Sequence, residues 1–275
     1  MSSQFGRKPA YNKQFKRDSQ RLAPSLQVSL VFMAQCFRFG WRRCSPLNWA
    51  LAERKIMISQ ESFNKRCVDY DLKYRKAKKD ADELEILSIA EKEVFVEAFN
   101  SNPKPACHAG CSHCCHLRVV AYAHELVAIH RYVSSKLSTQ KRLEITERIR
   151  NQYEKIKDLT EAEHFVVNVE CPFLENHKCS IYPVRPMTCA SYHSCSEAVC
   201  KQSYDEPSDM SAGIPLNPRV SIEQDIQFSV VEQVIKYNKD DAEKYELLQG
   251  LHKLFQNPKA IQRWKSGRKM FKNFS

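Results

Sequence analysis

The chain has little glycine and no long apolar run. Only six of its 275 residues are glycine, and no Gly-rich loop of the kind that cradles phosphates is present, which argues against a nucleotide site of that type. The stretch LQVSLVFMAQCFRF at residues 26–39 is interrupted by four polar or charged side chains. A membrane-spanning helix needs about 20 apolar residues, and a signal peptide needs a small-residue cleavage site. Neither pattern is found, and we therefore predict a cytoplasmic protein.

Net positive charge is concentrated at one end of the chain. The formal net charge is +11, but residues 1–56 carry +9 of it and the remaining residues are almost neutral. Basic proteins gain affinity for nucleic acids by releasing counterions, so a neutral main part argues against that class. We predict that residues 1–56 form a basic, poorly ordered extension. The alternative is an amphipathic helix at residues 26–43 that lies on an anionic membrane surface.

Residues 57–275 are predicted to be mainly α, a helical domain around a loop-rich cysteine metal centre with short β segments. Apolar residues at steps of three and four predict the helices, and runs of β-branched residues predict the strands. Ser221 and Gln224 match a capping box and predict a helix start. Cys67 falls on an apolar stripe and is expected in the core, whereas His124 and His130 are expected on helix surfaces. The predicted helices span residues 62–99, 124–137, 143–156, 241–255 and 258–269, and the predicted strands lie within 117–123 and 165–173.

Nine of the twelve cysteines lie between Cys107 and Cys200. Cysteine makes up about 4% of the chain, below the roughly 8–10% that is typical of small disulfide scaffolds, so metal binding is favoured. The first half of the cluster is CHAGCSHCC at residues 107–115. Side chains of adjacent residues such as Cys114 and Cys115 diverge, so the pair is expected to serve two metal centres or two irons of one cluster. Eight cysteine ligands would complete two four-coordinate sites. One cluster with spare cysteines would use the same residues.

The full pattern resembles a known family. CHAGCSHCC, followed by CPFLENHKCSIYPVRPMTC at residues 171–189, is similar to the YkgJ-like cysteine-cluster proteins, a zinc- or iron-chelating family, over roughly residues 105–202. The spacing at the start of the motif also resembles the radical-SAM motif, but His113 stands where those enzymes have an aromatic residue. Certain flagellin lysine methylases carry a similar cluster, which keeps an enzymatic role open. Cys195 is an extra relative to the family pattern. The resemblance implies metal binding by Cys107, Cys111, Cys114, Cys115, Cys171, Cys179, Cys189 and Cys200.

The kind of metal is not fixed by thiolate spacing. A structural four-cysteine zinc site usually has two CxxC pairs, and this cluster has one clean pair and a doublet, which favours an iron-sulfur cluster over Zn²⁺. Arg185 either pairs with a thiolate centre or forms an ordinary salt bridge. The nearby histidines are expected to surround the metal rather than to bind it; they are His108, His113, His116 and His193.

Three functions from different classes follow from these patterns. The first is a metal-binding protein with a structural, chelating or electron-carrying centre, and an unknown protein or small molecule as partner. The second is an iron-sulfur-dependent enzyme, for example a lysine N-methylase-like or redox enzyme. The third is a zinc-dependent nucleic-acid-binding protein with a basic tail.

Overall fold

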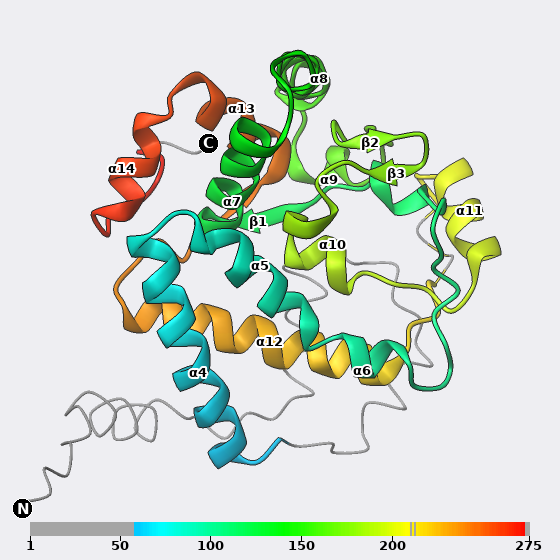
Figure 1. Ribbon diagram of the computed structural model, residues 1–275. Coiled ribbons are helices and arrows are strands. Elements are labelled where there is room, and N and C mark those ends of the chain that lie inside the picture. The colour runs from blue at the N-terminus through cyan, green and yellow to red at the C-terminus, as the bar shows by residue number, and fades with distance from the viewer. Residues whose placement is uncertain (1–57, 210, 212, 273–275) are drawn as a thin grey trace, which may run out of the picture.

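The computed structural model describes residues 58–209, 211 and 213–272, and it confirms the mainly α class (Figure 1). The predictions for residues 1–56 therefore lie outside the described residues. None of the described helices is long and apolar enough to cross a membrane. The α-helices are α4 (Gln60–Lys79), α5 (Glu83–Glu93), α6 (Val96–Phe99), α7 (Ala123–Lys136), α8 (Thr139–Ile156), α9 (Glu161–His164), α10 (Met187–Ser191), α11 (Glu197–Asp205), α12 (Pro218–Tyr237), α13 (Leu247–Gln256) and α14 (Lys259–Lys265). The 3₁₀ helices are η1 (His113–His116) and η2 (Tyr182–Val184).

Within the described ranges, the helices are accompanied by two small antiparallel sheets. In one, β1 (Val120–Tyr122) pairs with β4 (Lys244–Glu246) in the centre of the molecule. In the other, β2 (Leu174–Glu175) pairs with β3 (Lys178–Cys179) at the edge of the cysteine region. β1 falls within the strand predicted at residues 117–123, and that prediction is confirmed.

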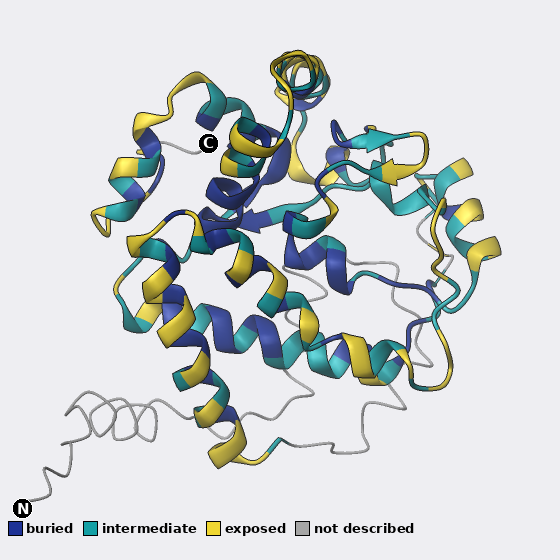
Figure 2. Cartoon of the chain, viewed as in Figure 1, coloured by how far each residue is buried: buried dark blue, intermediate teal, exposed yellow. Residues whose placement is uncertain are grey.

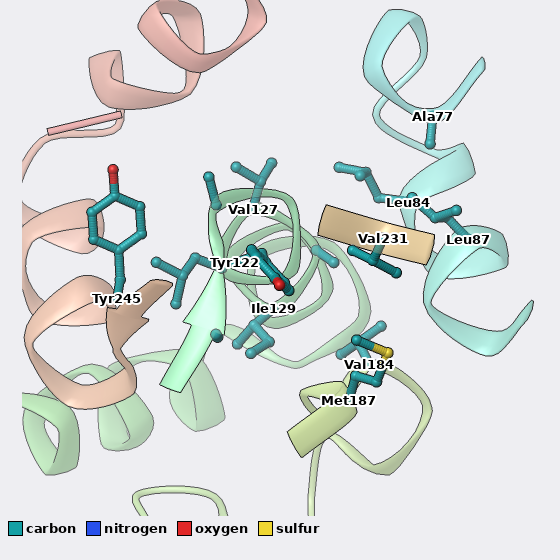
Figure 3. Packing of buried hydrophobic residues seen from close by; sticks show 14 of the residues in the cluster. Ala77, Leu84, Leu87, Tyr122, Val127, Ile129, Val184, Met187, Val231 and Tyr245 are labelled. Carbon is teal, nitrogen blue, oxygen red and sulfur yellow. The ribbon is translucent and has the colours of Figure 1, made fainter. Parts of the chain in front are cut away.

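The hydrophobic core lies between α4, α5, α7, α12 and α13. The buried faces of these helices point toward one another (Figure 2), and Figure 3 shows Leu84, Tyr122, Ile129 and Val231 meeting at the centre. Cys67 is fully buried on α4, as predicted. The apolar stripe predicted for residues 124–137 is confirmed by α7, the first half of which is buried on all sides. This core gives the short cysteine-bearing elements a rigid surface to pack on.

The single helix predicted over residues 62–99 is three helices instead. The first break is at Asp80, which has an extended backbone and whose carboxylate accepts the N–H of Asp82 at 3.1 Å. Such a local side-chain hydrogen bond offers the backbone an alternative to the helix. A second interruption at Val94 separates α5 from the single turn of α6.

Two helix starts near the C-terminus also differ from the predictions. The N-cap of α12 is Asn217 rather than Ser221; its Oδ1 accepts the N–H groups of Arg219 and Val220, and Pro218 occupies the first helical position. Ser221 lies inside the helix and donates to the Asn217 carbonyl. The helix predicted over residues 241–255 is preceded by β4, because residues 244–246 pair with β1. The last helix ends at Lys265, before Gly267 with φ +77°.

The buried carboxyl group of Asp225 on α12 is expected to make the stability of the protein depend on pH. Its Oδ2 is buried without a hydrogen-bond partner among the described residues, and burial raises its pKa to about 7 from 3.8. The folded protein then binds more protons than the unfolded chain between about pH 4 and pH 7, so the free energy of unfolding falls as the pH rises through that window. We expect Asp225→Asn to remove this loss and to stabilise the protein by about 2–3 kcal/mol at pH 8. Urea denaturation at several pH values measures how the free energy of unfolding changes with pH in the wild type and in Asp225→Asn.

The matched control for this experiment is Asp69→Asn, at an exposed position on α4. This variant should keep the pH slope of the wild type because the side chain that it replaces is exposed. Equal slopes in Asp225→Asn and the wild type would contradict the prediction.

Candidate metal centre

The cysteines predicted to bind metal lie on short elements and loops outside the helical core. Cys114 and Cys115 are on η1, Cys189 is on α10 and Cys200 is on α11. The elements β2, β3, α10 and α11 all lie in the right half of Figure 1, opposite α14. The fold therefore gathers the two halves of the sequence pattern on one side of the molecule.

Backbone hydrogen bonds hold the second half of the pattern against the first. The N–H of Cys171 donates to the carbonyl of Cys115 at 2.8 Å, and the N–H of Val169 donates to the carbonyl of His116 at 3.0 Å. These bonds explain why the strand predicted at residues 165–173 is wrong. Val166 closes a turn, with its N–H on the Glu163 carbonyl at 3.2 Å, and Val169 bonds to η1 and not to a strand.

A tight hairpin positions Cys171 and Cys179. The turn between β2 and β3 consists of Asn176 and His177, both with positive φ (47° and 60°), which is the geometry of a two-residue hairpin turn. Arg148 on α8 supports the near end of the hairpin, where its guanidinium donates to the carbonyls of Leu174 at 2.6 Å and Cys171 at 3.4 Å. The two cysteines are thus fixed relative to each other by the turn.

Cys189 is positioned by the core. Val184 and Met187, on either side of Arg185, insert into the hydrophobic cluster (Figure 3). The buried carboxylate of Glu125 accepts the N–H of Met187 at 2.7 Å at the start of α10. The ammonium of Lys92 donates to the carbonyls of Pro183 at 2.6 Å and Arg185 at 3.0 Å. The segment of Arg185 and Pro186 therefore cannot shift without breaking these hydrogen bonds to Glu125 and Lys92.

Four thiols form an inner group, which we define as Cys115, Cys171, Cys179 and Cys189. Burial raises the pKa of the Cys179 and Cys189 thiols, and that of Cys171 to about 12, and the neighbouring sulfurs raise all three further. The pKa of Cys115 is lowered, first by the side chain of Cys114 and then by Arg185. Thiols must lose their protons to bind a metal, so a cation bound here would remove the mutual repulsion that keeps them protonated.

Backbone N–H groups point at three of the sulfurs. The N–H of His113 lowers the pKa of Cys111, and those of Phe173 and Ile181 do the same for Cys171 and Cys179, although burial, the larger effect, raises all three. Each N–H is two residues after its cysteine. Hydrogen bonds to sulfur stabilise the thiolate form and tune the potential of a bound cluster.

The remaining predicted ligands form an outer group, defined as Cys107, Cys111, Cys114 and Cys200. The thiol of Cys200 has its pKa raised by burial first and then by Cys107 and Cys111, which places these three sulfurs near one another. Cys114 lies between the groups: its pKa is raised first by Cys115, and Cys189 and Cys107 contribute as well. Seven of the eight predicted residues line one cavity, and the eighth, Cys200, interacts electrostatically with Cys107 and Cys111.

Cys195 lies at the edge of the outer group, where burial first and then Cys107 raise the pKa of its thiol. Its Sγ donates to the carbonyl of Pro103 at 3.6 Å, and its N–H donates to the carbonyl of Pro215 at 2.7 Å. Next to it, the N–H of Ala106 donates to the carbonyl of Ser194 at 2.7 Å, so this segment holds the loop that carries Cys107. The role of Cys195 and its neighbours is to connect chain segments.

Arg185 lies beside the inner group, in agreement with the first of its two interpretations. Its guanidinium stacks on the ring of Tyr182 at 3.6 Å, and its charge lowers the pKa of Cys115, Cys179 and Cys189 against the effect of burial on all three. A fixed cation at this place offsets negative charge on the thiolates.

The histidines near the motif differ from one another. His193 is buried, with Nδ1 at 2.9 Å from the Ser191 carbonyl and Nε2 accepting the N–H of Asn217 at 2.8 Å, so both ring nitrogens are used. His116 packs its ring on Tyr204. His113 is different, because its ring nitrogen, the Sγ of Cys111 and a carboxylate oxygen of Glu197 all lie within 4.8 Å of one another. Glu197 was missed by sequence reasoning, since no motif connects it with Cys111.

A cavity of about 740 Å³ adjoins the cysteines. It is lined by the inner group and by Cys107, Cys111 and Cys114, and its other walls are mostly apolar, including Phe99, Leu117, Phe165, Ile214 and Leu216. A pocket of this size can hold a small molecule next to a metal.

A buried polar cluster beneath α10 was also missed. His124, predicted on a helix surface, is 2% exposed, and its Nε2 lies 2.8 Å from the Glu91 carboxylate, which also accepts from Tyr70 at 2.6 Å. Burial lowers the pKa of His124, but the charge and hydrogen bond of Glu91 and the charge of Glu125 together outweigh it, and the pKa is raised. The prediction failed because the start of α7 is buried on all sides, which a one-sided helix pattern cannot reveal. One available signal was Glu125 at the third position of α7, which marks the start of the helix because its carboxylate accepts the N–H of Tyr122.

The donor set fits a thiophilic metal. Thiolates with nearby cations and N–H donors are the surroundings in which zinc and iron-sulfur centres are held. Residues 106–210 match the CxxCxxCC family, described as "Putative zinc- or iron-chelating domain". No curated protein and no solved structure matches the chain.

Proposed function

Because residues 106–210 form a domain of the zinc- or iron-chelating CxxCxxCC family, we propose that the chain is a metal-binding protein whose inner group holds an iron-sulfur cluster. The observation that carries this proposal is the convergence of four partly buried thiols, from η1, the hairpin and α10, beside the cation of Arg185. The eight ligands proposed are the inner group and the outer group together.

The spacing of the sulfurs supports iron-sulfur over zinc for the inner group. In a tetrahedral zinc site with Zn–S bonds of 2.3 Å, the sulfurs are about 3.8 Å apart. Within the described part of the chain, no three cysteine sulfurs lie within 4.8 Å of one another. A cluster of several irons is wider than one ion and takes one thiolate per iron, so its ligands stand further apart.

The surroundings of the inner group are suited to a centre that carries electrons. An iron-sulfur cluster supplies one-electron transfer when it is bound. The guanidinium of Arg185 and the N–H groups of Phe173 and Ile181 stabilise added negative charge on the thiolates. The Glu125 and Lys92 contacts keep Cys189 and Arg185 in place as the charge changes.

The experiment that tests this function is the content of iron, zinc and acid-labile sulfide per chain, on the full chain purified without oxygen. We expect iron and sulfide in equal amounts, about four of each if the inner group holds a four-iron cluster. Zinc without sulfide in the inner group would overturn the iron-sulfur assignment and leave a zinc-chelating module.

A second candidate is an iron-sulfur-dependent enzyme, and the specific observation that favours it is the cavity of about 740 Å³ beside the cysteines. Such an enzyme needs room for a substrate next to the cluster, and the mostly apolar walls would exclude water from it. For methyl transfer of the radical type, S-adenosylmethionine added to the reduced protein should change the electron paramagnetic resonance spectrum of the cluster. An unchanged spectrum would count against that chemistry.

A further inference from the structure

The group of Cys111, His113 and Glu197 is the strongest unassigned feature of the molecule. Of all His, Cys, Asp and Glu side chains in the described ranges, these are the three whose ligand atoms lie within 4.8 Å of one another. The first two precede and begin η1, whereas Glu197 is the first residue of α11. Since Glu197 lies far from Cys111 and His113 in the sequence, its meeting with them is a product of the fold.

The surroundings of these three side chains add further donors. Cys200 is three residues after Glu197 on α11, which puts both on one helix face. His108 lies with Nε2 at 3.2 Å from the other side of the Glu197 carboxylate. The trio is therefore embedded in the outer group, with a histidine that orients its carboxylate.

The spacing of the trio fits one ion and not a cluster. With bonds of about 2.0–2.3 Å to sulfur, nitrogen and oxygen, the ligands of a tetrahedral zinc ion are about 3.3–3.8 Å apart, and small side-chain movements bring three atoms within 4.8 Å to that spacing. The combination of one thiolate, one imidazole and one carboxylate suits a divalent transition metal. It does not suit a cluster that needs a thiolate on each iron.

The site is also open to solvent on the side of Glu197. The side chain of Glu197 is 50% exposed and that of His108 is 55% exposed. Three protein ligands with the fourth position open to water, or to a neighbouring thiolate, are typical of zinc sites that react or exchange rather than of closed structural sites.

We propose that Cys111, His113 and Glu197 bind a single exchangeable divalent ion of the zinc class, so that the protein holds two different metal centres. The proposal rests on the proposed function in assigning the outer group to metal binding. The inner group holds the enclosed cluster, and the mixed-donor site at its rim takes one ion from solution.

Cobalt(II) titration of the anaerobically purified full chain tests the proposal, because Co²⁺ reports tetrahedral coordination and a thiolate ligand through its absorption bands. We expect one equivalent to produce the visible bands of tetrahedral cobalt and a thiolate charge-transfer band, and Zn²⁺ to displace it. His113→Asn and Glu197→Gln should each weaken cobalt binding at least tenfold, since each removes a ligand. His116→Asn is the matched control, on the same 3₁₀ helix and packed on the same Tyr204 ring, and should bind cobalt as the wild type does.

The outcomes separate the two proposals. Cobalt bands that persist unchanged in His113→Asn and Glu197→Gln would overturn the mixed-donor site, because cobalt held by the cysteines alone would give the same signal in both variants. Iron and sulfide contents equal to those of the wild type in these variants show that the inner centre is intact. If the wild type contains no sulfide but the two substitutions still weaken cobalt binding, the cluster assignment fails and the mixed-donor site stands.

Discussion

Serine in place of Cys189 is expected to lower the iron and sulfide content of the purified protein to less than one tenth of the wild-type value. Cys189 interacts with the other three thiols of the inner group, and it belongs to the segment that the core holds most firmly. A serine hydroxyl does not ionise near neutral pH and is a poor ligand for iron, so three thiolates would have to hold the cluster. Chemical analysis of iron and sulfide, with the spectrum of the reduced protein, measures the effect.

Cys195→Ser is the matched control for this variant. Cys195 is near the outer group, but its Sγ donates to the Pro103 carbonyl, and a serine hydroxyl can keep that bond. We expect wild-type iron and sulfide in Cys195→Ser. A Cys189→Ser protein that keeps its sulfide, with an unchanged circular dichroism spectrum, would remove Cys189 from the ligand set. A loss of helical signal would instead point to a folding defect, and Cys171→Ser then provides the independent test.

Alanine in place of Asn217 is expected to lower the free energy of unfolding by about 3–5 kcal/mol. Asn217 is fully buried; its Nδ2 donates to the carbonyls of Ser101 at 3.1 Å and Pro103 at 2.7 Å, and its Oδ1 caps α12. Removing the cap costs about 1 kcal/mol, and each buried carbonyl left without a partner adds about 1–3 kcal/mol. Urea denaturation followed by circular dichroism measures the loss.

Asn217→Asp separates the two contributions. The aspartate keeps an oxygen that can cap α12 but cannot donate to the two carbonyls, so its loss of stability should reflect the carbonyls and the buried charge. A loss below about 1 kcal/mol in Asn217→Ala would show that the connection between residues 101–103 and α12 contributes little. The prediction also bears on the metal centre, because the loop after Pro103 carries Cys107.

Local patterns in the sequence predicted most of the helices but not their ends. The apolar stripes of α7 and α8 were found because spacing along a helix repeats within a few residues. The ends of α4 and α12 depend on single side chains, those of Asp80 and Asn217, whose competing hydrogen bonds a stripe does not encode. β4 was missed because its partner β1 lies far away in the sequence.

The sequence by itself predicted the chemistry of the candidate metal centre: thiolate ligands, their number, and the segments at residues 107–115 and 171–200 that would supply them. The tertiary structure decided how the ligands are divided. The bonds from Cys171 to Cys115 and from Ala106 to Ser194 place Cys115 with the hairpin and Cys107 near α11, and the packing of α11 on η1 brings Glu197 to Cys111 and His113. Ligand type is a property of each residue and can be read locally. Grouping depends on contacts between residues far apart in the chain, which only the folded backbone creates.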